Sequence, residues 1–222
     1  MIKRKIILFM GKKYAHKAID YSLKKGFDFD FCCAENIDSL YPLINKKIDF
    51  LISFGSGTVI PERIVNDKNF MSLNIHAGSP EYPGRDPHHF AIYNNAKKYG
   101  ATLHLMHEKV DSGPIIDIEI FNVPKNITPD RLLGLANKAG WKILKRFFKK
   151  ISEENKVNFL KSAKWGKNKT TRKMFYELCN IPLNITEEEF KKRLVATSSK
   201  NYNNLFIDIY GHRFRIQGKA KI

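Results

Sequence analysis

The 222 residues are 43% hydrophobic and 27% charged, which excludes a disordered or fibrous chain and fits one large domain, alone or with a small appendage. No apolar run approaches the roughly 20 residues that span a bilayer, so we expect no membrane partner. The basic-flanked run from Ile6 to Met10 is too short for the apolar segment of a signal peptide. We therefore expect a cytoplasmic protein.

Charge is the unusual bulk property, because 39 Lys and Arg against 22 Asp and Glu give a net charge of +17. Residues 1–121 carry a net charge of +2 and residues 122–222 carry +15. Such a basic half is typical of a protein that binds nucleic acid, an anionic membrane surface or a phosphorylated small substrate. A solvated, lysine-rich surface explains it equally well, since 30 of the 39 basic residues are Lys.

The chain has three cysteines, of which Cys32 and Cys33 are adjacent on a predicted strand and Cys179 is distant. Neighbours on a strand point to opposite faces, and an odd count leaves one thiol unpaired. The pattern fits neither a disulfide framework nor a metal-binding pair of cysteines. We expect three reduced thiols.

Strand and helix patterns alternate over the first 120 residues. Apolar or alternating runs predict strands, and the amphipathic segments between them predict helices. The predicted strands are 5–10, 27–33, 49–54 and 70–75, and the predicted helices are 14–25, 38–47 and a short one that begins at Pro61. This alternation predicts an α/β domain with a Rossmann-like, open and mostly parallel sheet.

Beyond the fourth predicted strand the patterns are more varied. Up to residue 151 they predict a loop rich in Pro and Gly at 76–87, a helix at 87–98, strands at 101–106 and 114–121, and a long helix from Thr128 to Ile151. After it they predict basic loops at 152–173 and a helix that follows the capping box Thr186–Glu189. The last predicted element is a hairpin of strands 205–210 and 213–217 that turns at Gly211-His212. We therefore expect a main domain at residues 1–155 and a small α+β appendage at 156–222 that ends in the hairpin.

Five of the seven histidines lie between residues 76 and 107, which raises the question of a metal site. His104 and His107 are three apart on a predicted strand and should point to opposite faces, and the neighbours His88 and His89 cannot chelate together. No His-Glu-x-x-His motif or pair of spaced cysteines accompanies them. We predict no bound metal.

A second polar group is more informative. Asn74 and His76 end the fourth predicted strand two residues apart, so both side chains project from one face while Ile75 faces the other. Ligands of open α/β sheets bind outside the carboxyl ends of the strands, and Asp111 lies in the loop 108–113 that leaves another strand. Together they would supply a hydrogen-bond donor, an imidazole that polarises a group or moves a proton, and a carboxylate that orients it. The alternative is a buried histidine with satisfied hydrogen bonds beside an Asn that stabilises a turn.

Several linked motifs surround this group. They are Ser72-Leu73-Asn74-Ile75-His76, Pro80-Glu81-Tyr82-Pro83-Gly84-Arg85-Asp86-Pro87, Ala91-Ile92-Tyr93-Asn94, Gly100-Ala101-Thr102-Leu103-His104-Leu105-Met106 and Asp111-Ser112-Gly113-Pro114-Ile115-Ile116. In order and spacing they resemble the signature of the 10-formyltetrahydrofolate-dependent formyltransferases. Residues 49–57 and Pro61 are similar to the strand, loop and turn on that family's folate side. The resemblance is strong over 49–121, fair over 1–48 and faint beyond residue 155.

The resemblance implies that Asn74, His76 and Asp111 are catalytic. The family moves the formyl group of N10-formyltetrahydrofolate, its co-substrate, to an amine through a tetrahedral intermediate, and no Ser or Cys nucleophile is needed because the amine attacks. Asn74 and His76 would donate hydrogen bonds to the developing oxyanion, and Asp111 would hold His76 or relay the amine proton to the folate nitrogen through a water. Main-chain groups of two loops would line the folate pocket. The implied cofactor-binding residues are Phe54, Gly55, Ser56, Gly57, His107, Glu108 and Val110.

Two positions depart from the family pattern. Pro83 rather than Arg precedes Gly84, with Arg85 after it, and Ala77 stands where the family more often has Pro. We interpret both as tuning of the acceptor side.

Members of the family differ in the amine that they formylate. Purine-synthesis enzymes have a Gly-Ser-Gly loop where this chain reads Met10-Gly11-Lys12-Lys13-Tyr14. Methionyl-tRNA enzymes carry a C-terminal five-stranded barrel, for which the residues after about 155 are too few. Lipid A enzymes carry a dehydrogenase domain, for which we find no pattern in this sequence. The best fit is to sugar N-formyltransferases, which act on nucleotide-linked amino sugars such as dTDP-4-amino-4,6-dideoxyglucose in O-antigen lipopolysaccharide biosynthesis. Their terminal hairpin resembles residues 204–217 and often forms a dimer, so we expect a homodimer.

The diphosphate of such a substrate would give the positive surface something to bind. The candidate substrate-binding residues are Gly11, Lys12, Lys13, Tyr82, Arg85 and Asp86, and Trp165 or Tyr82 is a candidate to stack on the base, although each also fits a surface or packing role. Two alternatives stay open, a methionyl-tRNA formyltransferase-like enzyme and a non-catalytic nucleic-acid-binding protein. Aromatic residues among the lysines favour the latter, but most of them fall at the spacing of a helix core. They are Trp141, Phe147, Phe148 and Trp165.

Overall fold

The computed structural model describes residues 3–154, 156–199 and 201–216. Its main strands are β1 (Arg4–Phe9), β2 (Phe29–Ala34), β3 (Phe50–Phe54), β4 (Met71–His76), β5 (Lys98–Leu105) and β6 (Ile115–Asn122). They form one sheet in the order β2-β1-β3-β4-β5-β6. The first four are parallel to their neighbours, whereas β5 is antiparallel to both β4 and β6. The predicted α/β class with a mostly parallel sheet is thus confirmed, and the last two pairings are antiparallel because β5 alone of the six strands runs in the opposite direction.

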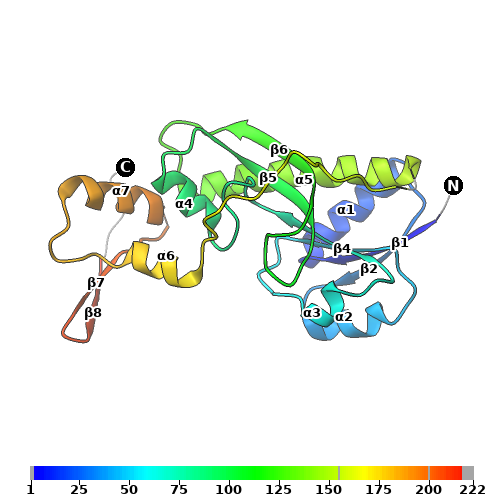
Figure 1. The fold of residues 1–222 in the computed structure, drawn as a ribbon, viewed down its shortest axis with the longest axis horizontal. Coiled ribbons are helices and arrows are strands. Elements are labelled where there is room, and N and C mark those ends of the chain that lie inside the picture. Colours follow the sequence, from blue (N-terminus) through cyan, green and yellow to red (C-terminus); the bar gives the residue numbers. More distant parts are fainter. Residues whose placement is uncertain (1–2, 155, 200, 217–222) are drawn as a thin grey trace.

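Helices cover both faces of the sheet (Figure 1). One face packs against α1 (Lys12–Lys24) and α5 (Pro129–Glu153), and the other against α2 (Ile37–Ile44) and α3 (Glu62–Val65). The alternation of side chains along β1 shows why, since Ile6 and Leu8 belong to the first layer and Ile7 and Phe9 to the second. Strands buried on both faces are continuous apolar runs, which is how residues 50–54 read in the sequence.

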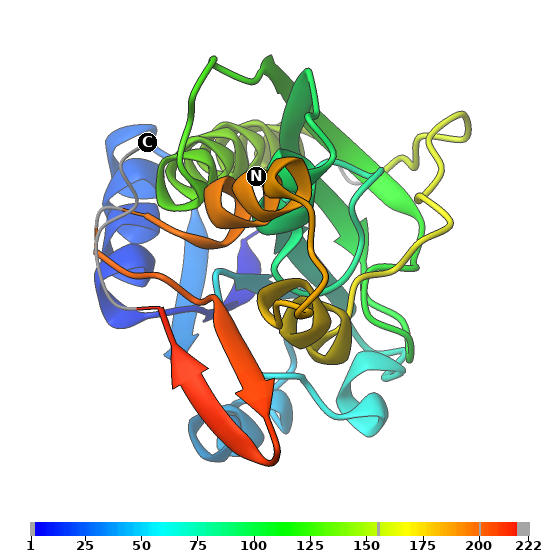
Figure 2. The same ribbon diagram turned by 90° about the vertical axis from the view of Figure 1, so that its left-hand side faces the viewer.

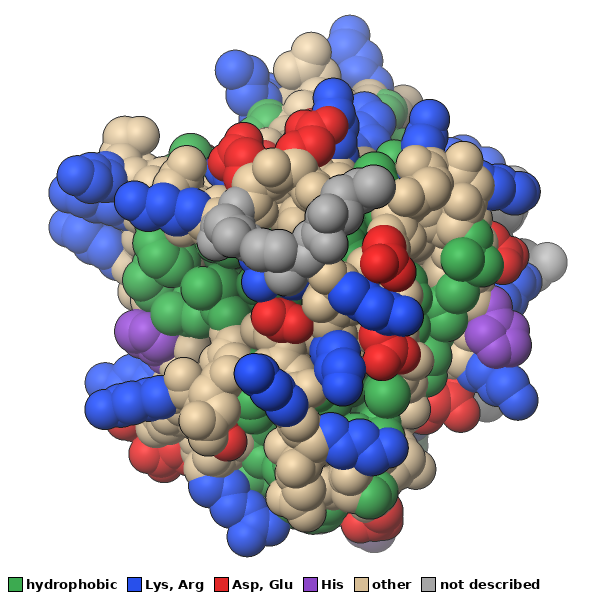
Figure 3. Space-filling view, turned by 90° about the vertical axis from the view of Figure 1, so that its right-hand side faces the viewer, with side chains coloured by type: hydrophobic (Ala, Val, Ile, Leu, Met, Phe, Trp, Pro, Cys, Tyr) green, Lys and Arg blue, Asp and Glu red, His purple; other side chains and the backbone are tan. Residues whose placement is uncertain are grey.

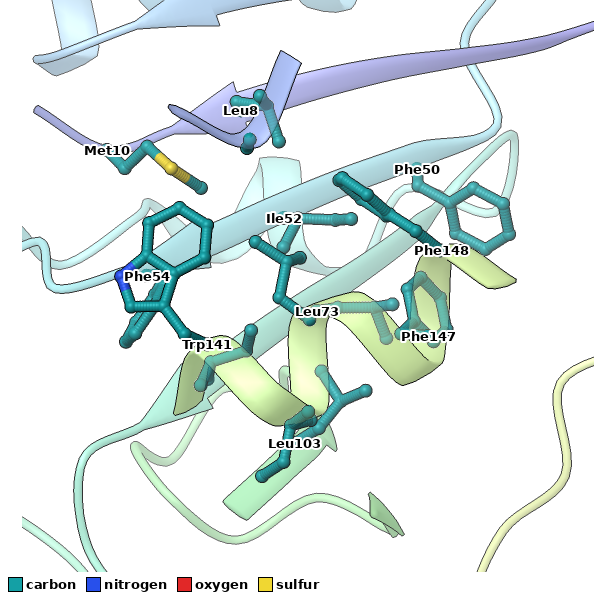
Figure 4. Close-up of a cluster of buried hydrophobic side chains, with 14 of the residues drawn as sticks. Leu8, Met10, Phe50, Ile52, Phe54, Leu73, Leu103, Trp141, Phe147 and Phe148 are labelled. Carbon is teal, nitrogen blue, oxygen red and sulfur yellow. The ribbon is translucent and has the colours of Figure 1, made fainter. Parts of the chain in front are cut away.

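The larger core lies between the sheet and α5 (Figure 4). Phe147 packs edge-on against Phe50 with ring centroids 5.4 Å apart, and Trp141 packs against Phe54 at 5.7 Å. Burying a side chain of this kind contributes about 1.5–3 kcal/mol. This core also contains the apolar residues of β4 and β5. It therefore fixes the position of these two strands, which carry polar side chains on the face of the sheet that points away from α5.

After α5 the chain runs back past the start of β6, where the N–H of Leu160 donates to the carbonyl of Ile115 at 2.7 Å. It then forms a smaller group of elements that lies at one end of the molecule (Figures 1 and 2). These elements are α6 (Arg172–Cys179), α7 (Glu187–Thr197), β7 (Phe206–Ile209) and β8 (His212–Arg215), beside α4 (Pro87–Tyr93).

Helix α7 fixes this group to α4. The Nδ1 atom of His89 lies 2.6 Å from the carbonyl oxygen of Ala196, and the Tyr93 hydroxyl donates to the carboxylate of Glu189 at 2.7 Å. The C-terminal elements are therefore connected to the helix that follows the loop rich in Pro and Gly. A domain boundary at residue 155 stays a prediction.

Three local predictions need correction. The predicted helix 87–98 ends at Tyr93, because Asn95 takes a left-handed conformation with φ of 51°, and Lys98 already belongs to β5. Helix α6 was not predicted, and its first residues lie in the stretch predicted as loops. The hairpin turns one residue earlier than predicted, at Tyr210-Gly211, where both residues have positive φ as a type I′ turn requires. Gln217, the predicted end of its second strand, lies outside the described residues.

The basic side chains are spread over the surface. Figure 3 shows Lys and Arg scattered across one face, with carboxylates between them, and no single continuous basic patch there. Part of the positive charge of α5 is locally neutralised, because Arg146 forms ion pairs with Asp117 at 2.9 Å and Glu119 at 2.6 Å. Across the described part of the chain, no helix has the length and apolar character needed to cross a membrane.

Candidate active site

The carboxyl end of β4 places two polar side chains on one face of the sheet. Asn74 and His76 alternate with Ile75, which belongs to the core beneath α5. On the neighbouring antiparallel strand β5, His104 lies opposite Asn74 and Thr102 lies opposite His76. Residues directly opposite on an antiparallel pair share a face, so the two strands together form a polar patch.

Asp111 reaches this patch from the loop between β5 and β6. Its backbone is left-handed, with φ of 47°, and its side chain is 2% exposed. One carboxylate oxygen, Oδ2, lies 3.3 Å from Nδ1 of His76, and the other, Oδ1, lies 3.3 Å from Nε2 of His104. The main-chain N–H of Gly84 also donates to Oδ2 at 2.8 Å. The structure therefore brings Asn74, His76 and Asp111 into one group and adds His104 to it.

The hydrogen bonds of the two imidazoles determine where their protons lie. The Nε2 atom of His76 is 2.9 Å from the carbonyl oxygen of Tyr82, and Nδ1 of His104 is 2.9 Å from the carbonyl oxygen of Leu105. A carbonyl only accepts, so each of these nitrogens donates. When the rings are neutral, the other nitrogen of each carries a lone pair that faces Asp111. A proton that enters this group can therefore be shared between the carboxylate and an imidazole.

Burial and neighbouring charge act in opposite directions on the pKa values here. Burial lowers the pKa of His76 below its ordinary value, although Asp111 and the Tyr82 carbonyl favour the charged ring. Burial alone would raise the pKa of Asp111, but His76, His104 and the N–H of Gly84 outweigh it and hold that pKa below its ordinary value. At neutral pH Asp111 is thus ionised and His76 is neutral, with Nδ1 available to take up a proton.

Asn74 is the most accessible member of the group. It is half-buried, whereas His76 and His104 are only 8% and 2% exposed. Its Nδ2 atom lies 3.2 Å from Nε2 of His104, which accepts from the amide when the ring is neutral. A primary amide has two N–H donors, so one remains for a ligand at the end of the strand.

The loop after β4 covers His76 closely. A Cβ atom added to Gly78 would collide with the imidazole of His76, so this position has room only for glycine. The next turn of the loop supplies the Tyr82 carbonyl and the Gly84 N–H, which hold His76 and Asp111. The loop thus fixes both side chains through main-chain groups.

A small cavity adjoins the loop between β5 and β6. It has a volume of about 260 Å³ and is lined by Asn66, His107, Glu108, Lys109 and Ser112. A second hollow of about 660 Å³, lined in part by the same Asn66 and His107, continues along the start of β4. Of the predicted cofactor-binding residues, His107 and Glu108 line the small cavity, and the neighbouring Val110 leaves 46% of its surface exposed.

The other predicted cofactor-binding residues are the last residue of β3 and the three residues after it. The Phe54 side chain is buried against Trp141, so only its main chain is left to contact a ligand. Gly55 and Gly57 are exposed, and the Ser56 hydroxyl accepts from the N–H of Thr58 at 3.2 Å. This loop therefore offers backbone groups and little side-chain chemistry.

The predicted substrate-binding residues fall into two separate places. Gly11, Lys12 and Lys13 follow β1 and are exposed at the start of α1, where Glu35 accepts from the main-chain N–H of Lys12 at 2.6 Å. Tyr82, Arg85 and Asp86 lie in the loop after β4, and β3 separates the two strands. Tyr82 is half-buried against Tyr99, with ring centroids 5.9 Å apart.

Two residues of the site were not predicted to belong to it. His104 was considered only as a metal ligand, although its alternation with Thr102 in an otherwise apolar run was a usable signal. Trp165 was a candidate to stack on a base. That stacking stays a prediction, and in this structure the ring packs against His104 and His76, with centroid distances of 5.0 Å and 5.9 Å. No local sequence pattern predicts the contact of Trp165 with the two histidines, because it depends on the path of the chain after α5.

In the ranges that the structure describes, there is no group of three or more His, Cys, Asp or Glu that could hold a metal ion. The rings of His88 and His89 are 4.3 Å apart. All three cysteines are free thiols, with Cys33 exposed and Cys179 buried.

The chain is similar in sequence to known formyltransferases. The sequence matches the family described as "Formyl transferase" over residues 33–146, slightly more than half of the chain. A methionyl-tRNA formyltransferase of Hydrogenobaculum sp. (strain Y04AAS1) is 32% identical over 104 residues, which are 46% of this chain and 34% of that protein. The chain spans between a quarter and a half of the length of the first curated relatives that it matches.

Solved structures share the fold over nearly all of the chain. A 4-N formyltransferase from Francisella tularensis has a TM-score of 0.78 at 21% identity, covering 99% of this chain and 98% of that one. An N-formyltransferase from Helicobacter canadensis, solved in complex with folinic acid and dTDP-3-aminofucose, has a TM-score of 0.68 at 19% identity, covering 95% and 85%. At these identities the likeness shows the fold alone.

Proposed function

The chain belongs to the formyl transferase family. We therefore propose that it transfers the formyl group of N10-formyltetrahydrofolate to an amine, and that Asn74, His76 and Asp111 are its catalytic residues. The observation that carries the proposal is the buried Asp111 carboxylate, whose two oxygens each lie 3.3 Å from a ring nitrogen, of His76 and of His104. Such a group can take up and hold one proton. Formyl transfer requires the protein to take a proton from the attacking amine and to deliver one to N10 of the departing tetrahydrofolate.

Each residue has a distinct task. The free N–H of Asn74 donates to the formyl oxygen, on which negative charge develops during transfer. Neutral His76 takes up a proton at Nδ1, and ionised Asp111, 3.3 Å away, stabilises the resulting charge. The Nε2–H of His76 is engaged by the Tyr82 carbonyl in this structure. The family-implied donation from His76 to the oxyanion therefore needs that bond to be exchanged.

The small cavity fits one end of a folate. Its lining residues are Asn66, His107, Glu108, Lys109 and Ser112, whose hydroxyl donates to the Lys109 carbonyl at 2.6 Å. They make a polar lining with both donors and acceptors, which suits a flat heterocycle with both kinds of group. When bound, the folate supplies an activated formyl group. The exposed side chain of Val110, next to Asp111, gives such a ring an apolar surface to cover.

The acceptor that fits best is a nucleotide-linked amino sugar, such as dTDP-4-amino-4,6-dideoxyglucose, in the synthesis of a cell-surface polysaccharide such as O-antigen. Support comes from the similarity to the Francisella 4-N formyltransferase, which extends through α6, α7 and the hairpin and covers 98% of that chain. The Helicobacter relative with the same fold is solved with a dTDP-amino sugar. In the cytoplasm, where folate and nucleotide sugars are made, the protein would act as a homodimer.

A second candidate is formylation of methionyl-tRNA. It is favoured by the names of the first curated relatives, one of them 32% identical over 104 residues, and by the net charge of +15 in residues 122–222. Against it, these relatives share at most about three quarters of this chain. The ion pairs of Arg146 also reduce the cationic character of α5.

An acceptor panel distinguishes the two. The protein would be incubated with 10-formyltetrahydrofolate and, separately, dTDP-4-amino, dTDP-3-amino and UDP-amino sugars and methionyl-tRNA, and the products analysed by mass spectrometry. We expect a formylated dTDP-amino sugar, and none in a parallel incubation without the folate. Formylation of methionyl-tRNA alone would overturn the sugar assignment, and no product with any acceptor would contradict the proposed reaction on this panel.

A further inference from the structure

The stretch after α5 crosses the loop that covers the catalytic group, and we call its residues 160–170 the strap. Near its middle, the N–H of Gly166 donates to the carbonyl of Pro80 at 2.8 Å. The contact is so close that a Cβ atom on Gly166 would collide with the carbonyl of Glu81. The strap therefore lies directly on the loop after β4, with its main chain against the main chain of that loop.

The end of the strap is fixed to the same loop. Thr170 pairs with Gly84 as in a parallel bridge. Its hydroxyl contacts the carbonyl oxygens of Pro83 at 3.1 Å and Arg85 at 2.7 Å. Gly84 is the residue whose N–H holds Asp111, so the strap is connected to the catalytic carboxylate through a single residue.

Trp165 is the strap residue that reaches the catalytic group itself. Its indole N–H donates to the carbonyl of Gly113 at 2.8 Å, two residues after Asp111. Its ring meets His104 edge-to-face at a centroid distance of 5.0 Å and an angle of 88°, and it meets His76 at 5.9 Å and 69°. Such contacts favour one ring orientation over others. Trp165 thus touches both imidazoles whose lone pairs face Asp111.

We propose that Trp165 is a positioning residue, which holds His76 and His104 in the orientations that face Asp111 and excludes water from the three side chains. The inference rests on the proposed function for its catalytic meaning, but the geometry that it describes belongs to the protein without substrate. Trp165 lies outside residues 33–146, over which the family is matched. The strap therefore completes a site whose other residues lie within the matched region.

The consequence is measurable at His76. The groups that act on its ring are Asp111, His104 and the carbonyl of Tyr82, and burial is the largest cause of its lowered pKa. Removing the indole admits water to the ring, which favours the charged form. The pKa of His76 should then rise toward the ordinary value of about 6.5, and turnover should fall because the imidazole is no longer fixed.

The test is an NMR titration of His76 in the full chain without ligands. Trp165→Ala should raise the His76 pKa. Trp165→Met, which fills part of the space without a ring, should raise it by a smaller amount and serves if the alanine variant does not fold. Trp165→Phe restores an aromatic ring and should bring the pKa back to the wild-type value. Phe159→Leu is the matched control, since this side chain adjoins the strap, is 40% exposed and should leave the titration unchanged.

A second readout connects the titration to catalysis. On the acceptor found active, Trp165→Ala should lower kcat at least tenfold with a smaller change in KM, and Trp165→Phe should recover most of it. A wild-type His76 pKa in folded Trp165→Ala and Trp165→Met would overturn the proposal whether or not the protein transfers formyl groups. A raised pKa in a protein without formyl transfer would support the positioning role and refute the proposed function instead.

Discussion

At the scale of single residues, the positions of the protons on His76 and His104 determine whether the catalytic group can take up another proton. The carbonyls of Tyr82 and Leu105 occupy one N–H of His76 and one of His104, which turns the remaining nitrogens toward Asp111. The carboxylate is then surrounded by atoms that accept protons, apart from the N–H of Gly84. This arrangement has a place for an additional proton, and that is the property we assign to catalysis.

The position of the His76 ring depends on the absence of a side chain at Gly78. In Gly78→Ala the added methyl group would collide with the imidazole of His76 and break its bond to the Tyr82 carbonyl. We expect kcat to fall at least a hundredfold, as for loss of a catalytic donor, with a destabilisation of about 1–3 kcal/mol. Kinetics and urea denaturation measure the two effects.

The control for this substitution is Gly134→Ala. Gly134 lies in α5, and no atom lies within 4 Å of where its Cβ would be. Alanine is the better helix former by about 1 kcal/mol, so this variant should be slightly stabilised and fully active. Equal activity of Gly78→Ala and Gly134→Ala would contradict the close packing described here.

Residue patterns indicate only part of such a site. Asn74 and His76 could be placed together because alternation along one strand is local. Asp111 was predicted to join them from the carboxyl end of another strand, but β5 runs antiparallel to β4, so a shared edge of the sheet does not explain its position. His104 needed knowledge of the strand opposite Asn74. Trp165 needed the path of a loop of about 18 residues between α5 and α6, which no periodicity encodes.

The same limit applies at the scale of elements. The strands and α5 were predictable because their apolar residues recur with the period of the structure they form. Helix α6 is short and mostly exposed, so its pattern is weak and its stability comes from packing and from Thr171, whose side chain accepts from the N–H of Met174. The hairpin turn was misplaced by one residue because Tyr is an unexpected choice for a left-handed position.

Helix α4 gives the fold a built-in sensitivity to acid. His88 is 8% exposed, its Nδ1 atom has no hydrogen-bond partner among the described residues, and burial together with the neighbouring His89 lowers its pKa to about 3. In the unfolded chain a histidine titrates near 6.5. Between those two pH values the unfolded state binds a proton that the folded state does not, so stability is lost as the pH falls below about 6.5.

Urea denaturation at several pH values checks this. Between about pH 7 and pH 5, His88→Phe should lose less stability than the wild type, by up to about 1.4 kcal/mol per pH unit. His16→Phe, on the exposed face of α1, is the control and should follow the wild type. An identical pH dependence in His88→Phe and the wild type would show that His88 is not buried in its neutral form.

At the scale of the whole molecule, the hairpin is the least supported element. A two-stranded hairpin is marginally stable alone. Among the residues that the structure describes, β7 and β8 pair only with each other apart from a single bridge between Asn180 and Phe206. Arg213 pairs across the hairpin with Asp208 at 2.8 Å and also contacts the hydroxyl of Tyr176 in α6. Yet Tyr210 is 98% exposed and Phe214 57% exposed, an apolar surface that suits burial against a second copy of the chain.

Sedimentation velocity tests that assignment. We expect the wild type to sediment as a dimer and Phe214→Asp as a monomer, because a carboxylate cannot be buried in the interface without a partner. Leu183→Asp is the control, since Leu183 is 78% exposed in the loop before α7 and lies outside the hairpin. A monomeric wild type, or a Phe214→Asp variant that remains dimeric, would refute dimerisation through the hairpin.

We assign formyl transfer to Asn74, His76 and Asp111. The rate of transfer from 10-formyltetrahydrofolate to the dTDP-amino sugar, measured in the wild type and in Asn74→Ala, tests this assignment. We predict loss of roughly 100-fold to 1,000-fold in kcat, as for one oxyanion donor, with the cooperative unfolding transition retained. The exposed Asn122 at the end of β6 supplies the matched control, Asn122→Ala, at the wild-type rate. Turnover by Asn74→Ala equal to that of Asn122→Ala would contradict the account.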